Sequence, residues 1–380
     1  MNNQTSTDDR PHRWILQTWN LQPVLIPLYA ILLAFIVGGV LIALIGVNPF
    51  EAYWALLRGM FGTPDRIAGS IARSVPFIGS ALALAFAFRA GLFNIGAEGQ
   101  LLVGGLAAGW AGTWAFMYDT PGIIAIPIVI VAGFVGGALW GGIPGALRAT
   151  TGAHEVITTI MLNSIALFGT RWLINSTDPK ILRDTSASVP RTKEISETAR
   201  LPQLVDSQPP LHMGLFLMLG LCLVVAFVLK RTTFGFETIT VGTNPHAARY
   251  AGVNVNRIII LAMVLAGGFA GLAAASEVAG TNYFFQPGTF AFIGFDGIAI
   301  ALLARTNPIA IIPAALLWGS LLSGAPLMQQ EADVSIDVVR VIQAMVLLFV
   351  AADAIVRWVF HVRDGTESHL DAPTTGLSSA

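Results

Sequence analysis

Charged residues are scarce in this chain, and their scarcity excludes most soluble folds. Of its 380 residues, 11% are charged and 54% are hydrophobic, and the mean hydropathy is +0.70. Soluble domains carry about a quarter charged residues. Apolar runs of roughly 18–25 residues, long enough to cross a bilayer as a helix, recur along nearly the whole sequence. We therefore predict an all-α integral membrane protein rather than a β-barrel.

The sequence also lacks the common signatures of catalysis, nucleotide binding and metal binding. None of the three lysines follows a glycine, so the chain has no P-loop. The single cysteine, Cys222, lies in an apolar run, where it packs or faces lipid, and it cannot form an intramolecular disulfide. The formal net charge of −1 leaves no basic excess for nucleic acid. No catalytic residue, metal ligand or cofactor is predicted.

The apolar runs predict about ten transmembrane helices. In chain order they cover residues 24–47, 70–88, 93–117, 123–147, 154–174, 211–229, 258–275, 290–303, 308–322 and 336–358. A short interfacial helix is predicted over residues 50–61. The transmembrane domain (24–358) is flanked by a cytoplasmic segment (1–23) and a disordered cytoplasmic tail (359–380).

Ten spans place both termini on one side of the membrane, and the basic residues indicate which side. By this arrangement one compartment receives Arg10, Arg13, Arg89, Arg148, Lys230, Arg231, Arg249, Arg257, Arg305, Arg357 and Arg363. The positive-inside rule makes that compartment the cytoplasm. We therefore predict a multi-pass protein of the plasma (or bacterial inner) membrane with both termini cytoplasmic, an external loop (175–210) and a cytoplasmic loop (230–257).

A polar, glycine-rich stretch at residues 91–100 interrupts apolar sequence. A helix that begins near Phe93 would place Asn94 and Glu98 one turn apart on one face. Ionisable groups at membrane depth usually face a bundle interior or a water-filled path. The stretch is then either a loop at the membrane surface or a broken helix that lines a transport path, and we favour the broken helix.

Two further predicted spans carry patterns on one face. Glycines recur every fourth residue at Gly133, Gly137, Gly141 and Gly145, a spacing that allows another helix to approach closely. In the span 154–174, Glu155, Thr159 and Asn163 form a polar stripe that faces protein or water. For Thr159 and Asn163 a hydrogen-bond ladder between helices and a contact to a solute are equally compatible with the pattern.

The cytoplasmic loop contains a complete miniature helix. Asn244 suits the N-cap, Pro245 the first helical position, and Gly252 the residue just beyond the end. About two turns of helix are not stable alone, so this helix must pack against something. It either rests on lipid headgroups or docks as a coupling helix on a motor protein; the candidate coupling residues are Asn244, Pro245, Ala247, Ala248, Arg249, Tyr250 and Gly252.

Four stretches together resemble one family. They are residues 234–254, 91–100, 154–163 and 294–304, which read Phe234-Gly-Phe-Glu…Gly242-Thr-Asn-Pro…Ala-Gly252-Val-Asn, Gly91-Leu-Phe-Asn-Ile-Gly-Ala-Glu-Gly-Gln100, His154-Glu-Val-Ile-Thr-Thr-Ile-Met-Leu-Asn163 and Gly294-Phe-Asp-Gly-Ile-Ala-Ile-Ala-Leu-Leu-Ala304. They resemble permease subunits of bacterial ABC importers, in the nucleoside or "simple sugar" branch of the ribose and branched-chain amino-acid permease superfamily. The resemblance extends over residues 23–357 in the same order. His154 stands where this branch often has Asn.

The resemblance implies two inverted halves, with the third span paired to the eighth, and two permease subunits around one path. It implies a cytoplasmic ATP-binding subunit, an external substrate-binding lipoprotein and a second, non-identical permease as partners. The solute would be a nucleoside or a related sugar, moved into the cytoplasm without catalysis by this chain. The predicted substrate path consists of Asn94, Glu98, Thr159, Asn163 and Asp296.

A secondary transporter and an intramembrane enzyme are the two alternatives to an ABC importer. In an ion- or proton-coupled secondary transporter, Glu98 or Asp296 would carry the coupling proton, as buried carboxylates are able to do. An intramembrane enzyme is disfavoured because no nucleophile–base pair or metal-ligand cluster is visible. The capped helix favours the importer, because a secondary transporter has no motor subunit that would dock on such a helix. A structural role for Glu98 and Asp296 stays open.

Overall fold

The computed structural model describes residues 22–177 and 181–352. The helices are α1 (Gln22–Leu44), α2 (Pro49–Phe61), α3 (Pro64–Arg89), α4 (Ala97–Ala111), η2 (Ala115–Tyr118), α5 (Gly122–Thr151), α6 (Glu155–Asn175), η3 (Glu197–Ala199), α7 (Gly214–Arg231), α8 (Thr233–Thr243), α9 (Pro245–Tyr250), α10 (Val255–Glu277), η4 (Val278–Asn282), α11 (Ile293–Leu303), α12 (Ile311–Ala332) and α13 (Ile336–Ala351). Strands β1 (Gln203–Val205) and β2 (Leu211–His212) form an antiparallel hairpin. The predicted tail, almost all of the predicted N-terminal segment, and Arg10, Arg13, Arg357 and Arg363 lie outside the described residues.

The predicted all-α membrane fold is confirmed. In the described part of the chain, seven helices are long and apolar enough to cross a membrane, namely α1, α3, α5, α6, α7, α10 continued through η4, and α12. The other three predicted spans correspond to the shorter helices α4, α11 and α13. The predicted interfacial helix is α2, which differs from its predicted bounds by one residue at its start. Helix α8 was not predicted.

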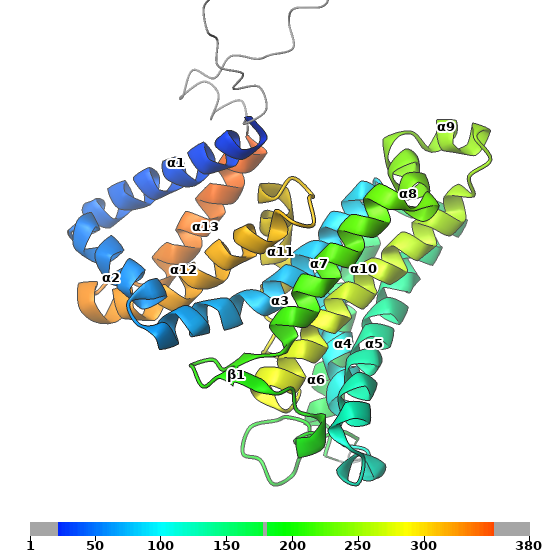
Figure 1. Cartoon of the computed structure of the whole chain (residues 1–380), viewed down its shortest axis with the longest axis horizontal. Coiled ribbons are helices and arrows are strands. Elements are labelled where there is room, and N and C mark those ends of the chain that lie inside the picture. The colour runs from blue at the N-terminus through cyan, green and yellow to red at the C-terminus, as the bar shows by residue number, and fades with distance from the viewer. Residues whose placement is uncertain (1–21, 178–180, 353–380) are drawn as a thin grey trace, which may run out of the picture.

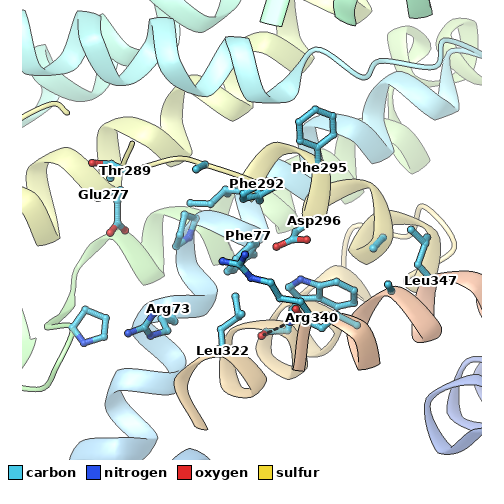
Figure 2. A pocket seen from close by; sticks show the side chains of 18 of the residues that line it. Arg73, Phe77, Glu277, Thr289, Phe292, Phe295, Asp296, Leu322, Arg340 and Leu347 are labelled. Carbon is cyan, nitrogen blue, oxygen red and sulfur yellow. Dashed lines mark hydrogen bonds between the residues drawn. The ribbon is translucent and has the colours of Figure 1, made fainter. Parts of the chain in front are cut away.

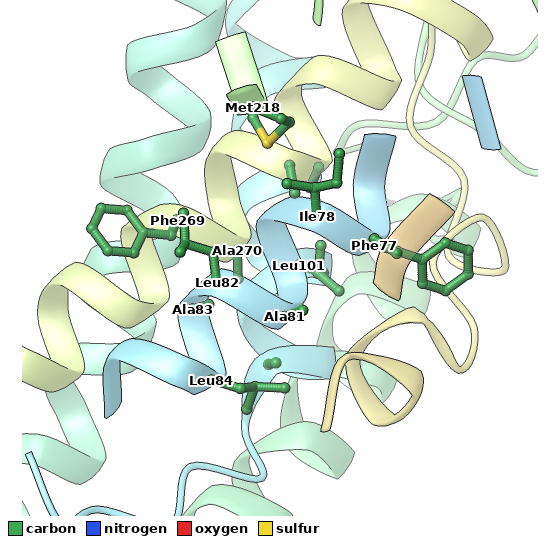
Figure 3. Packing of buried hydrophobic residues seen from close by; sticks show 14 of the residues in the cluster. Phe77, Ile78, Ala81, Leu82, Ala83, Leu84, Leu101, Met218, Phe269 and Ala270 are labelled. Carbon is green, nitrogen blue, oxygen red and sulfur yellow. The ribbon is translucent and has the colours of Figure 1, made fainter. Parts of the chain in front are cut away.

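The core is built around α3, which α10, α11 and α12 surround. Figure 3 shows small and large apolar side chains of α3 together with Met218 of α7 and Phe269 and Ala270 of α10. The predicted glycine stripe faces α10: a Cβ atom on Gly137 would lie 2.8 Å from the Cα of Gly271, and one on Gly141 would lie 3.0 Å from the Cα of Gly267. Close backbone contact therefore joins α5 to α10, as the spacing indicates.

The first interruption in the membrane lies between α3 and α4. Gly91 has a φ of +72°, a conformation that favours glycine. The side chain of Asn94 accepts a hydrogen bond from the backbone N–H of Gly96 (2.9 Å). This local bond competes with helical hydrogen bonding, so α4 begins at Ala97 and the predicted start near Phe93 is wrong. Asn94 lies before the helix and does not share a helical face with Glu98.

The second interruption lies between α10 and α11. After η4 the chain turns through Tyr283, with a φ of 63°, and reaches Phe292, with a φ of 69°. Helix α11 then begins at Ile293 and has only 11 residues, about 16 Å at 1.5 Å per residue. It is therefore a half-helix rather than a complete span.

The two half-helices run antiparallel, as the resemblance implies for the third and eighth spans. Where α4 ends, Gly112 accepts a hydrogen bond from Ser196 of the loop 175–210 (2.9 Å). Where α11 ends, the carbonyl of Thr306 accepts a hydrogen bond from Arg89 at the end of α3 (3.3 Å). The start of each half-helix therefore meets the start of the other inside the bundle.

The two ends of the bundle differ in structure. Helices α8 and α9 lie at one end, and the hairpin with the loop 175–210 lies at the other (Figure 1). The loop is tied to the segment after α10: Thr192 donates to the carbonyl of Phe285 (3.0 Å), Ile195 to that of Tyr283 (2.8 Å) and Leu201 to that of Ala279 (2.8 Å). The described residues 181–210 of this polar segment therefore form a folded cap.

A buried histidine lies inside this cap. The side chain of His212 has no exposed surface, and its Nδ1 accepts a hydrogen bond from the backbone N–H of Gly214 (3.1 Å). Burial lowers the pKa of His212 from 6.5 to about 4, because the charged imidazolium would lose its hydration. The neutral ring therefore helps to join β2 to the start of α7.

Candidate functional site

Glu98 joins the two half-helices. Its Oε1 accepts a hydrogen bond from the backbone N–H of Phe292 (2.9 Å), and its Oε2 accepts one from Gly294 (2.8 Å). Glu98 lies in the first turn of α4, and the two donors lie at the start of α11. One carboxyl group therefore meets the starts of two helices and fixes the two starts together.

Asn94 and Asn163 fix the interruption before α4 against α6. The side chain of Asn163 accepts a hydrogen bond from the N–H of Gly99 (2.9 Å) and donates one to the carbonyl of Ile95 (2.9 Å). Asn94 is fully buried and donates to the side chain of Gln100 (3.2 Å). The polar stripe of α6 thus satisfies backbone groups that the interruption leaves free of helical hydrogen bonds.

The remaining stripe residues are also held by local contacts. The hydroxyl of Thr159 is buried and donates to the carbonyl of Glu155 (2.7 Å). Glu155 pairs with Arg148 at the end of α5 (3.3 Å). Asn94, Glu98, Thr159 and Asn163 are thus brought together around the start of α4, and their role in a substrate path stays a prediction.

Asp296, the fifth predicted path residue, lines a cavity of about 540 Å³. Walls from α3, the end of α10, α11, α12 and α13 enclose it, and Pro209 from the hairpin also lines it. The volume falls in the range of roughly 300–1,000 Å³ that small-molecule sites occupy. Glu98 does not line the cavity, but its hydrogen-bond partner Phe292 does.

Four charged side chains line this cavity: Arg73, Glu277, Asp296 and Arg340. Figure 2 shows Arg73 toward the Glu277 side and Arg340 toward the Asp296 side. No ion pair joins these four described residues to one another; Arg340 pairs instead with Asp337 on its own helix (3.9 Å). The cavity therefore offers donors and acceptors that do not neutralise each other directly.

Aromatic side chains also line the cavity, together with aliphatic and small polar ones. Phe77 and Trp318 are buried, whereas Phe292 and Phe295 are exposed on the α11 side. The guanidinium of Arg340 lies 5.4 Å from the centre of the Phe292 ring. Flat apolar surfaces thus alternate with charged groups.

The sequence contained a signal for three of these residues that the path prediction did not use. Arg73 and Arg340 are ionisable residues inside predicted spans, and Glu277 opens the polar segment after the seventh span. Charge inside a span is in itself a sign of a functional position. Their meeting in one cavity depends on helices far apart in sequence, and a single sequence does not reveal it.

The predicted miniature helix is confirmed as α9. The side chain of Asn244 accepts hydrogen bonds from the N–H groups of His246 and Ala247 (3.0 Å each). Gly252 has a φ of +83° just beyond the end. The capping residues therefore act as the sequence indicates.

The surface of α9 has an inner and an outer face. Ala248 has no exposed surface and packs against Val241, Val255 and Ile258, whereas Tyr250 is 95% exposed. Asn244, Pro245, Ala247, Arg249 and Gly252 are also exposed. Of the predicted coupling residues, Ala248 therefore fixes α9 to its own chain and the others face outward.

Helix α8 connects α9 to the interruption before α4. Gly91 and Gly242 lie so close that a Cβ atom on Gly91 would be 2.9 Å from the Cα of Gly242. Phe86 of α3 also stacks on Phe234 of α8, with 6.3 Å between ring centres. The α8–α9 unit therefore contacts the backbone that leads directly to Glu98.

Comparison with known proteins decides the family. Residues 66–351 match the family described as branched-chain amino acid transport system / permease component. The chain belongs to this family. It is 40% identical over 342 residues to the guanosine ABC transporter permease protein NupP of Bacillus subtilis (strain 168), covering 89% of this permease and 96% of that protein. No solved structure matches it.

Two other relatives extend the comparison. The nucleoside ABC transporter permease protein NupB of Lactococcus lactis subsp. cremoris is 38% identical over 343 residues, covering 88% of this permease and 92% of that protein. The glucose ABC transporter permease protein TsgB13 of Haloferax volcanii is 33% identical over 333 residues, covering 85% and 86%. The chain is thus the membrane-spanning permease subunit of an ABC importer. It translocates rather than catalyses, and it works with an ATP-binding subunit and a substrate-binding protein.

Proposed function

We propose that this permease imports nucleosides into the cytoplasm. Its two relatives with the highest identities given above are named for guanosine and for nucleosides, and a relative at 33% identity is named for glucose. In the proposal, an external lipoprotein delivers the solute, a second, non-identical permease completes the path, and an ATP-binding subunit docks on α9. Both termini and α9 lie in the cytoplasm, and the hairpin end lies outside.

The observation that carries the proposal is the contact between α8 and the start of the half-helix region. A motor subunit that moves α9 would move Gly242 against Gly91, seven residues before Glu98. Glu98 in turn is bonded to Phe292 and Gly294, which lie beside the cavity. The same contacts therefore form a continuous mechanical route from the cytoplasmic surface to the cavity wall.

The path residues have separate places along this proposed route. Asp296 lies in the cavity, and Glu98 lies at the junction of the half-helices, between the cavity and the cytoplasmic end. Asn94 lies just before α4, and Thr159 and Asn163 lie on the face of α6 that meets the start of α4. When the two starts separate, these polar groups would line the opening and replace part of the solute's hydration.

A second permease is supported by the location of charge. Arg73 lies nine residues into α3, about 14 Å from its start, and Arg340 lies in the second turn of α13. Both side chains are exposed in the single chain. Because charge at membrane depth is costly against lipid, water or another subunit must cover this face.

The proposal is tested with the complete complex in proteoliposomes. Radiolabelled inosine and uridine should accumulate only with external binding protein and internal ATP. Glucose should accumulate at least about tenfold less, which corresponds to about 1.4 kcal/mol of free energy that discriminates between the two solutes. Uptake driven by a proton gradient without ATP would contradict the proposal and favour the secondary-transporter alternative. Preferential uptake of glucose would contradict the substrate class.

A further inference from the structure

The cavity next to α11 has the chemistry of a nucleoside-binding site. We infer that it is an outward-open binding site, which holds the solute after it leaves the binding protein. We also infer that this site selects an uncharged nucleoside. The inference rests on the proposed function and adds a location and a selectivity to it. It is supported by the location and lining of the cavity, by the balance of its charged residues and by the occupied N–H groups at the start of α11.

The location of the cavity fits a binding site that opens outward. Pro209 of the hairpin and Glu277 at the end of α10 lie on the side of the folded cap. Asp296 lines the cavity further along the bundle (Figure 2), and Trp318 of α12 lines it too. Beyond them the remaining turns of α11 pack against α3, and the Gly297 backbone approaches Ser80 and Leu84 so closely that a side chain there would collide with them. The cavity therefore ends against the half-helix before it reaches the α8–α9 end.

The lining matches both parts of a nucleoside. Every base has a flat π-face that stacks on aromatic rings, and the exposed ring of Phe292 provides such a surface. Ribose hydroxyls and base N–H groups are donors that a carboxylate such as that of Asp296 accepts. Base carbonyls and ring nitrogens are acceptors for a guanidinium such as that of Arg340.

The charges of the cavity favour a neutral solute. Two guanidinium groups balance two carboxylates, so no positive excess is available for a phosphate. The start of α11 would otherwise attract anions, as helix starts do. Here the N–H groups of Phe292 and Gly294 are already occupied by Glu98. A nucleoside monophosphate would therefore meet no net positive charge, whereas the nucleoside itself would bind.

Thiol labelling tests the inference on the intact complex. Ala344, exposed on α13, and Thr289 on the opposite side both line the cavity, and each is replaced by Cys in a Cys222→Ser background. Ser188→Cys, on the exposed loop, is the matched control. An impermeant thiol reagent added outside should label all three. Inosine or uridine should slow labelling of Ala344→Cys and Thr289→Cys, and leave Ser188→Cys unchanged.

The outcomes separate this inference from the proposed function. Nucleoside uptake by the wild-type complex without protection at either cavity position would overturn the site and leave the import proposal standing. Protection without any nucleoside uptake would support the site and overturn the import proposal. Equal protection by uridine 5′-monophosphate would overturn the selectivity for uncharged solutes, and stronger protection by glucose would overturn the nucleoside class.

Two variants assign the contacts. Phe292→Ala should raise the inosine concentration that gives half-protection by about tenfold, the scale of one lost stacking contact. Asp296→Asn should raise the half-protecting inosine concentration, and it should let uridine 5′-monophosphate protect, because one fewer carboxylate leaves a positive excess in the cavity. Phe168→Ala, on the outer face of α6, and Asp65→Asn, at the start of α3, are the matched controls and should change nothing. Unchanged protection in both cavity variants would overturn the assignment.

Discussion

At the scale of single residues, Glu98 is the link between the two half-helices, because its two oxygens hold two backbone N–H groups of α11. These contacts are confined to the junction, so removal of the side chain should affect the junction more than the rest of the bundle. We predict that Glu98→Ala abolishes uptake while the complex still assembles. Each hydrogen bond to a charged group contributes about 1.5–3 kcal/mol, enough to disrupt the junction.

The conservative variant Glu98→Gln distinguishes a hydrogen-bonding role from a charge requirement. Its single amide oxygen still accepts one of the two N–H groups, so it should retain more uptake than Glu98→Ala. Subunit content and uptake in vesicles across pH are the measurements, with Glu51→Ala, at an exposed position of α2, as control. A well-assembled but inactive Glu98→Gln would indicate an essential charge and revive proton coupling; loss of assembly in Glu98→Ala would make the residue structural.

His212 makes a prediction about pH. Its pKa is about 4 in the folded protein and about 6.5 when exposed, so the unfolded chain binds the proton first. The stability that neutral His212 provides is therefore complete above pH 6.5 and is lost progressively as the pH falls toward 4, by up to about 3 kcal/mol.

The measurement is the Tm of the purified complex at pH 7.5 and pH 5. The Tm of the wild type should fall more on acidification than the Tm of His212→Asn, because the variant has no imidazole to protonate. His246→Asn, at an exposed position on α9, should behave like the wild type. An identical pH dependence in His212→Asn would show that this histidine does not govern acid stability.

At the scale of secondary-structure elements, the turn after α9 positions the proposed docking surface. Gly252 has a φ of +83°, where a β-branched residue costs on the order of 1–3 kcal/mol. We predict that Gly252→Val lowers ATP-dependent uptake several-fold without preventing membrane insertion. Gly46→Val is the matched control, because Gly46 has a φ of +88° and lies between α1 and α2, away from α9. Equal uptake in the two variants would argue against a role for this turn in coupling.

Local signals predicted the elements well, and long-range contacts were the part that they missed. The cap and terminator of α9, the glycine stripe of α5 and the interfacial helix α2 follow from neighbouring residues, so the sequence was sufficient for them. The start of α4 was misplaced because the side chain of Asn94 bonds the backbone of Gly96. Helix α8 lies in a polar segment without strong periodicity and was overlooked.

The candidate site was predicted only in part for the same reason. The polar residues Asn94, Glu98 and Asn163 stand out against apolar neighbours, and the structure does bring them together. Their partners are backbone groups up to 196 positions away, which no local pattern reveals. Arg73 and Arg340 stand out equally, but only the packing of α11 against both α3 and α13 places them in the cavity with Asp296.

At the scale of the whole molecule, the two ends of the bundle should face different compartments. Single cysteines at Ser188, in the loop 175–210, and at Thr243, at the end of α8, are introduced in a Cys222→Ser background; both native side chains are exposed. We predict that an impermeant thiol reagent added to intact cells labels Ser188→Cys, and labels Thr243→Cys only after the membrane is opened. Labelling of both from outside would contradict the proposed orientation.

The central claim is that a motor subunit at α9 controls the cavity through α8, Glu98 and α11. The most direct measurement is the external labelling rate of Ala344→Cys in the assembled complex, with and without ATP trapped by vanadate. The account predicts that trapping changes this rate several-fold. It also predicts that Tyr250→Ala, which alters a 95% exposed side chain of α9, removes the change without altering the rate in the resting complex. An Ala344→Cys labelling rate that is the same in both states of the wild-type motor would contradict the account.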